Sequence, residues 1–178
     1  PSSYSIKTVL RSIAVHLKLA EPIQNFPKPF EFHEIDLILD VGANVGQYAI
    51  NCRKQGFKGT IVSFEPLPDA HNILKRKARN DEHWIVHPRS AIGSTPKEIN
   101  LNIAGNSYSS SVLEMLERHI QVAPESKYIS SVKTKLETID SILPIYLSNS
   151  NRILLKIDTQ GYEAEVIKGA IESLPKYP

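Results

Sequence analysis

The chain has 178 residues, with 21 Lys and Arg against 19 Asp and Glu and a formal net charge of +2. So small an excess of positive charge does not indicate a nucleic-acid partner. The single cysteine, Cys52, cannot form an intrachain disulfide, and no apolar run reaches the roughly 18 residues that a membrane span needs. We therefore predict a cytoplasmic protein without a transmembrane segment, long enough for one domain that buries roughly 70% of its unfolded surface.

Residues 1–34 are predicted to form a helix and a proline-containing linker. Apolar residues recur at helical spacing over residues 6–20, and three prolines follow. This helix either packs on the main domain or lies on a membrane surface. The main domain is expected to span residues 35–178.

The main domain alternates short apolar runs with amphipathic stretches, a pattern typical of an α/β fold with a mostly parallel sheet and helices on both faces. Strands are predicted at 37–42, 60–65, 84–87, 98–103, 132–136 and 152–157, and helices near 45–55, 69–79, 112–118 and 162–173. The polar segment 105–131 is the longest irregular stretch and is predicted to cover an active site.

The most informative motif is LILDVGANVG (Leu37–Gly46), which is typical of a buried strand that turns sharply into a helix. We expect the helix to begin at Asn44 or Val45 and to direct unpaired N–H groups at an anion, while small residues let the backbone approach the ligand. A dinucleotide site would have a glycine in place of Asn44, which disfavours a nicotinamide-dependent oxidoreductase. S-adenosylmethionine has no phosphate, and its carboxylate could meet the helix while its ammonium meets Asp40. The motif therefore favours S-adenosylmethionine as the cofactor.

Two further motifs each deliver an acid to the end of an apolar strand. GTIVSFEP (Gly59–Pro66) ends in Glu65, 19 residues beyond Gly46, a distance at which an acid can bind ribose hydroxyls. RILLKIDTQGYEAEVIKGA (Arg152–Ala170) places Asp158 at the end of another buried run. Because ligands of open α/β sheets bind outside the carboxyl ends of the strands, we expect Asp40, Glu65 and Asp158 to face one crevice. The alternative for Glu65 is a solvated carboxylate without a ligand.

The sequence resembles the FkbM family of S-adenosylmethionine-dependent methyltransferases. The resemblance covers residues 35–172 and rests on DVGANVGQY, FEP, SAIG, SSSVL, LETIDSIL and LKIDTQGYEAEVIKGA. It implies the Rossmann-like class I methyltransferase sheet and methyl transfer to a hydroxyl of a sugar, glycan or polyketide-like metabolite. The family domain continues with further strands, so the resemblance implies a chain that lacks the C-terminal strands. Strand 152–157 would then be a sheet edge, open to a longer chain or to a homo-oligomer.

The resemblance also implies which residues bind the cofactor: Asp40, Gly42, Ala43, Asn44, Gly46, Tyr48, Glu65, Pro66, Ser90 and Ala91. Glu65 would hold the ribose, and Ser90 and Ala91 would lie near the adenine. The methionine part would be surrounded by Asp40, Gly42, Asn44 and Gly46. For Ser90 and Ala91 the alternative is ordinary packing at a strand end, and for Tyr48 it is packing of the first helical turn.

An aliphatic hydroxyl needs a base that takes its proton, and we expect Asp158 to be that base or to orient the acceptor. Glu163 could assist as a second catalytic acid. The alternatives are that Asp158 caps the following turn and that Glu163 caps the helix start. The acceptor is predicted to contact Asn106, Ser109, Ser110 and Gln160, the last standing where many relatives have Glu; loop serines also commonly form turns.

Other functions remain as alternatives. A binding or scaffold protein could keep the fold without catalysis, as the missing C-terminal strands and Gln160 allow. Nucleic-acid methylation is disfavoured because the chain has no Asn/Asp-Pro-Pro-aromatic motif for a flipped base. No set of His, Asp and Glu has metal-ligand spacing, so no metal is predicted, although His87 lies near a strand end and could line the site.

Overall fold

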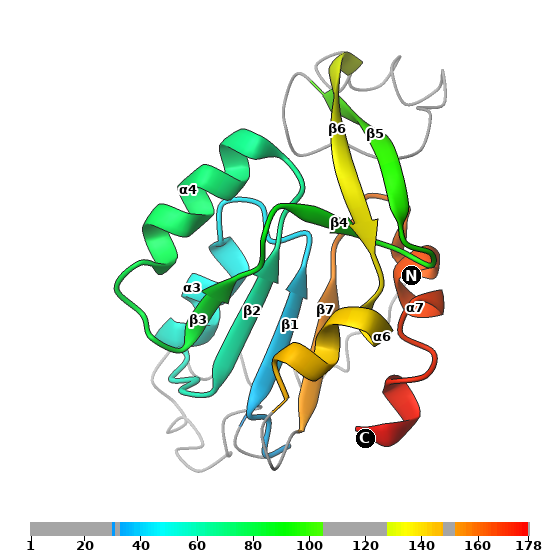
Figure 1. Cartoon of the computed structure of the whole chain (residues 1–178). Coiled ribbons are helices and arrows are strands. Elements are labelled where there is room, and N and C mark those ends of the chain that lie inside the picture. Colours follow the sequence, from blue (N-terminus) through cyan, green and yellow to red (C-terminus); the bar gives the residue numbers. More distant parts are fainter. Residues whose placement is uncertain (1–29, 31–32, 105–127, 148–151, 178) are drawn as a thin grey trace, which may run out of the picture.

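The computed structural model describes residue 30 and residues 33–104, 128–147 and 152–177. Figure 1 shows the chain coloured along its length. The elements in chain order are β1 (Leu37–Val41), α3 (Gln47–Lys54), β2 (Thr60–Phe64), α4 (Pro68–Ala78), β3 (Trp84–Val86), β4 (Ser90–Ile92), β5 (Lys97–Ala104), β6 (Tyr128–Glu137), α6 (Ile139–Ile142), the 3-10 turn η2 (Leu143–Ile145), β7 (Ile153–Ile157), α7 (Glu163–Lys168) and the 3-10 turn η3 (Leu174–Lys176).

The central sheet has the strand order β3-β2-β1-β7, and each neighbouring pair is parallel. All four strands therefore end at the same edge of the sheet. Leu37 pairs with Thr60 of β2 on one side and with Ile153 of β7 on the other. Among the described strands β7 has a neighbour only on its β1 side, which is the edge position predicted for it.

Helices cover both faces of this sheet, as predicted. Side chains alternate along β1, so Leu39 faces a cluster that includes Ile139 of α6 and Val166 of α7. Ile38 faces the opposite cluster, which includes Cys52 of α3 and Leu74 of α4. The α/β class and the mostly parallel sheet are confirmed.

A second sheet, with the order β4-β6-β5, extends past the carboxyl ends of β1 and β2 (Figure 1). In it β4 is parallel to β6, whereas β5 is antiparallel to β6. The sequence did not predict β4 because three residues are too few to show the alternation of apolar and polar side chains that is typical of a strand. The short helix α6 was also missed, although its start carries a signal: the side chain of Thr138 accepts a hydrogen bond from the N–H of Ser141 at 3.2 Å.

Three predicted boundaries were wrong. Helix α3 begins at Gln47 rather than at Asn44 or Val45, because Asn44 and Gly46 have left-handed backbones with φ of 49° and 86°. Helix α7 ends at Lys168 and does not run to residue 173. The end of the predicted cover, residues 128–131, belongs to β6.

The rest of that cover lies outside the described residues, as do the helix expected at 112–118 and the N-terminal helix expected over residues 6–20. In the part of the chain that the structure describes, no helix is long and apolar enough to cross a bilayer.

Arg53 ties the end of α3 to the amino-terminal edge of the central sheet. Its Nε donates to Asp81 Oδ2 at 2.7 Å, and its guanidinium also donates to the carbonyl oxygens of Phe57, Gly59 and His83, each at 2.9 Å. One planar group thus satisfies a carboxylate and three backbone acceptors, which is a task that suits the fork geometry of arginine.

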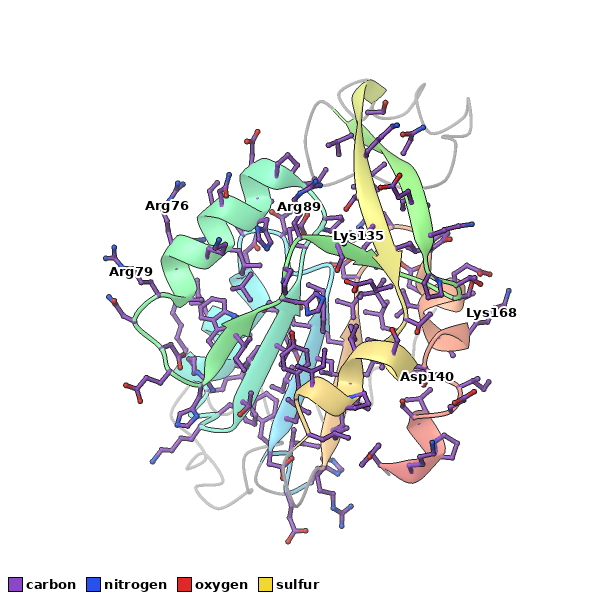
Figure 2. The ribbon with its side chains drawn as sticks, in the orientation of Figure 1. Arg76, Arg79, Arg89, Lys135, Asp140 and Lys168 are labelled. Carbon is purple, nitrogen blue, oxygen red and sulfur yellow. The ribbon has the colours of Figure 1, made fainter. Side chains whose placement is uncertain are left out.

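We expect Arg53→Met to lower the free energy of unfolding by about 2 kcal/mol, because it removes the cation paired with a partly buried carboxylate and a donor to three carbonyls. Urea denaturation measures the change. Arg76→Met is the matched control, since Arg76 is exposed on α4 and points away from the sheet (Figure 2). Equal stability of the two variants would contradict this role of Arg53.

Candidate functional site

The glycine loop, residues 42–46, connects β1 to α3 at the carboxyl edge of the central sheet. Its three left-handed residues are Gly42, Asn44 and Gly46, with φ of 73°, 49° and 86°. The N–H groups of Gly42 and Ala43 both donate to the carbonyl oxygen of Phe64, at 3.1 and 3.0 Å. The loop is therefore folded back over the end of β2, and α3 starts behind it without a side-chain cap.

The two glycines of this loop are needed for contacts within the protein. A Cβ atom on Gly42 would lie 1.9 Å from the carbonyl oxygen of Asp158. A Cβ on Gly46 would lie 2.8 Å from the Trp84 ring and 2.9 Å from Leu74. Within the protein these glycines therefore allow close contact with the end of β7, with Trp84 and with Leu74. That they also let the backbone approach a ligand stays a prediction.

Glu65 binds the glycine loop from the end of β2. Its Oε2 accepts a hydrogen bond from the N–H of Asn44 and its Oε1 accepts one from the N–H of Leu67, both at 2.8 Å. The side chain is buried, and this burial raises the pKa of Glu65 to about 7 in spite of the two backbone donors. When ionised, the carboxylate has about four lone-pair sites, and these backbone donors use two of them.

Asp40 lies beneath the loop with its side chain fully buried. Its Oδ1 forms an ion pair with Lys156 Nζ at 2.8 Å, and its Oδ2 accepts a hydrogen bond from Ser63 Oγ at 3.3 Å. Ser63 Oγ in turn accepts one from Trp84 Nε1 at 3.0 Å. Burial raises the pKa of Asp40, while Lys156 and Ser63 act against this rise. The carboxylate is thus surrounded by protein groups on the α3 side of the sheet.

Lys156 is the site residue that sequence reasoning missed. Its Nζ donates to the carbonyl oxygens of Gly42 at 3.0 Å and Val41 at 3.3 Å, and it lies 5.6 Å from the centre of the Tyr48 ring. A signal existed in the sequence: a lysine within an apolar strand such as ILLKI needs a buried partner. Tyr48 packs on this group as the first turn of α3 begins, and burial raises the pKa of Tyr48 to about 12.

Asp158 is exposed at the end of β7, directly beside the glycine loop. Its N–H donates to the carbonyl oxygen of Val41 at 3.0 Å, and its Oδ1 accepts a hydrogen bond from Gln160 Nε2 at 3.2 Å. Gln160 and Gly161 both have left-handed backbones, with φ of 54° and 97°. The tight turn that follows β7 thus presents the Asp158 carboxylate to solvent.

Glu163 stabilises this turn. Its Oε1 accepts hydrogen bonds from the N–H groups of Thr159 at 3.1 Å and Gly161 at 3.0 Å. Burial alone would raise the pKa of Glu163, but these backbone donors outweigh it and lower the pKa. These donors precede α7, whose start at Tyr162 has no side-chain cap, so Glu163 holds the turn and does not cap the helix as the alternative to catalysis expected. Its catalytic role stays a prediction.

The loop, Glu65 and Asp158 lie on one sheet edge, and residues 40–177 match the family described as the methyltransferase FkbM domain. The chain belongs to the FkbM methyltransferase family. It is 28% identical over 156 residues to methyltransferase sdnD of Sordaria araneosa, an alignment that covers 76% of this chain and 60% of sdnD. It is 26% identical over 148 residues to the hexuronic acid methyltransferase AglP of Haloferax volcanii, covering 81% of this chain and 54% of AglP. The chain thus spans less than two thirds of either relative, and no solved structure matches it significantly.

In this FkbM domain the other predicted cofactor residues lie at the start of the second sheet. The carbonyl oxygen of Pro66 accepts a hydrogen bond from Arg89 at 2.9 Å, so the end of β2 is tied to the segment that leads into β4. Ser90 and Ala91 are buried within β4, which pairs with β6. Asn106, Ser109 and Ser110, predicted to contact the acceptor, lie outside the described residues.

His87 lies on the other face of the sheet from Asp40 and Lys156. Its ring packs against Phe64 at a tilt, with 5.1 Å between ring centres, and its Nδ1 forms a hydrogen bond with the Tyr146 hydroxyl. Its Nε2 lies 2.9 Å from Glu137 Oε2. Burial would raise the pKa of Glu137, but the neighbouring Ser90 and His87 side chains lower it overall. Across the described ranges, no group of three His, Cys, Asp or Glu side chains could hold a metal ion.

The raised pKa of Glu65 makes the stability of the FkbM domain depend on pH. The unfolded chain loses this proton near pH 4.5, whereas the folded protein keeps it up to about pH 7. The contribution of Glu65 to stability is therefore complete below pH 4.5 and is lost as the pH rises through about 7. We expect the free energy of unfolding of the wild type, relative to Glu65→Gln, to fall by roughly 3 kcal/mol over this range. Urea denaturation at a series of pH values tests this, and a difference that stays constant with pH would contradict it.

Proposed function

We propose that this FkbM methyltransferase transfers a methyl group from S-adenosylmethionine to a hydroxyl oxygen of a sugar, glycan or polyketide-like metabolite. One observation carries the proposal: the glycine loop is hydrogen-bonded to Glu65 and lies directly against Asp158. A residue suited to a ribose and a residue suited to a hydroxyl acceptor are therefore held on either side of one loop. Membership of the family supports methyl transfer as the reaction.

The donor groups at the loop fit S-adenosylmethionine. The free acceptor sites of Glu65 suit the two ribose hydroxyls, and the first N–H groups of α3 have no side-chain cap and suit a carboxylate. When bound, S-adenosylmethionine supplies a methyl group on a positively charged sulfur. Because Asp40 is buried and paired with Lys156, we propose that it acts on the methionine part through the loop.

Asp158 is proposed to take the proton of the acceptor hydroxyl or to orient that hydroxyl. It is the exposed acid at this edge, and its backbone is fixed by the hydrogen bond to Val41. Gln160, whose amide already contacts the Asp158 carboxylate, is proposed to hydrogen-bond the acceptor. Methyl transfer is an in-line displacement, so a fixed distance between base and donor supplies much of the rate.

A sugar is the acceptor class that one relative supports, because AglP is named a hexuronic acid methyltransferase. We propose a glycan or sugar hydroxyl as the first class to test and polyketide-like hydroxyls as the second.

Calorimetric titration with S-adenosylmethionine tests the cofactor. We expect the wild type to bind it more tightly as the pH rises through about 7, because ribose hydroxyls donate to the ionised Glu65. Glu65→Gln should bind about tenfold more weakly at pH 8 and lose this pH dependence. Glu82→Gln, an exposed acid at the far edge of the sheet, is the control. No binding by the wild type would favour the alternative of a scaffold protein that keeps the fold alone.

Transfer of a labelled methyl group to a panel of glycosides, including hexuronic acid glycosides, tests the reaction. We expect Asp158→Asn to lower turnover by about 10² to 10⁴, the usual contribution of a general base, and to leave the Kd for S-adenosylmethionine within about threefold. Glu82→Gln again serves as the control. Full turnover by Asp158→Asn would exclude a role for this carboxylate as the base.

A further inference from the structure

Lys156 connects the strand that carries Asp158 to the loop proposed to hold the cofactor. In the parallel pairing of β1 and β7, Lys156 is the direct partner of Asp40. Its ammonium group donates hydrogen bonds to the carbonyl oxygens of Gly42 at 3.0 Å and Val41 at 3.3 Å, and it forms an ion pair with Asp40 Oδ1 at 2.8 Å. The ammonium group of Lys156 thus interacts with groups at the junction of β1 and the glycine loop.

This junction is where the two halves of the site meet. Asp158 follows Lys156 by two residues, donates its N–H to the Val41 carbonyl, and places its own carbonyl where a Cβ of Gly42 would be. Among the described strands β7 is an edge strand, held by hydrogen bonds only on its β1 side. Lys156 adds a side-chain link across this one pairing, at the end that carries the proposed base.

We propose that Lys156 is a positioning residue that fixes the glycine loop, through the carbonyls of Val41 and Gly42, relative to Asp158. The inference rests on the proposed binding of S-adenosylmethionine at this loop. In this proposal Lys156 does not contact S-adenosylmethionine. It holds the backbone of the glycine loop, and the loop contacts the cofactor. Its effect on cofactor affinity is therefore separate from its effect as the counter-ion of Asp40.

The competing role is that of a buried counter-ion and nothing more. Removing one partner of a buried pair leaves an uncompensated charge and is strongly destabilising, whereas replacing both partners is often nearly neutral. A counter-ion would matter only while Asp40 is charged. Donation to the two carbonyls matters whether or not Asp40 carries a charge.

A double-mutant cycle of Lys156→Met and Asp40→Asn separates the two roles. We expect Lys156→Met to lower the Tm by about 10 °C in the wild-type background, and by much less in the Asp40→Asn background, where no unpaired charge remains. We expect it to weaken S-adenosylmethionine binding by about tenfold in both backgrounds, because the carbonyl contacts are lost in both. The comparison within the Asp40→Asn background stands even if Lys156→Met alone does not fold.

Lys168→Met is the control, since Lys168 is exposed on α7 and points away from the body of the protein (Figure 2). It should change neither the Tm by more than about 2 °C nor the affinity. If Lys156→Met has no effect on affinity in the Asp40→Asn background, Lys156 is a counter-ion only and the inference is overturned. If the wild type does not bind S-adenosylmethionine, the proposed function fails and the inference fails with it.

Discussion

The contact between Gly42 and the carbonyl oxygen of Asp158 is the constraint on which the site depends. A Cβ on Gly42 would lie 1.9 Å from that oxygen, and φ at Gly42 is 73°. Glycine is therefore required both for space and for backbone conformation. Because this contact leaves no room for a side chain between the loop and the end of β7, the backbone of Asp158 stays beside the loop in any arrangement that keeps it. The proposed cofactor and acceptor residues thus share one backbone junction.

Much of the fold could be predicted from the sequence because β1 and β2 are buried on both faces and β7 is nearly as apolar. The runs at β1, β2 and β7 are apolar and each ends in an acid, so both the strands and the shared edge were evident. Strand β4 and helix α6 were missed because three or four residues show no period. The start of α3 was wrong because left-handed Asn44 and Gly46 delay the first turn.

The site was harder to predict than the fold. Pattern and spacing identified Asp40, Glu65 and Asp158, but not the partners that decide what each carboxylate can do. Asp40 is buried against Lys156, and Glu65 binds two backbone N–H groups, whereas Asp158 is exposed. These differences arise from contacts between segments far apart in the chain, which a local pattern does not contain. The roles of these acids in binding and catalysis remain predictions.

The pairing of Asp40 with Lys156 also bears on how the chain folds. A slip of β7 by one residue along β1 would turn each of its side chains to the opposite face. Leu155 or Ile157 would then stand opposite Asp40, and the lysine would enter the apolar cluster on the side of α6 and α7. Both a buried carboxylate and a buried ammonium would lack a partner, at a cost of several kcal/mol each. The ion pair between Asp40 and Lys156 therefore selects one register of β7 along β1 and disfavours misfolded states in which this strand has slipped.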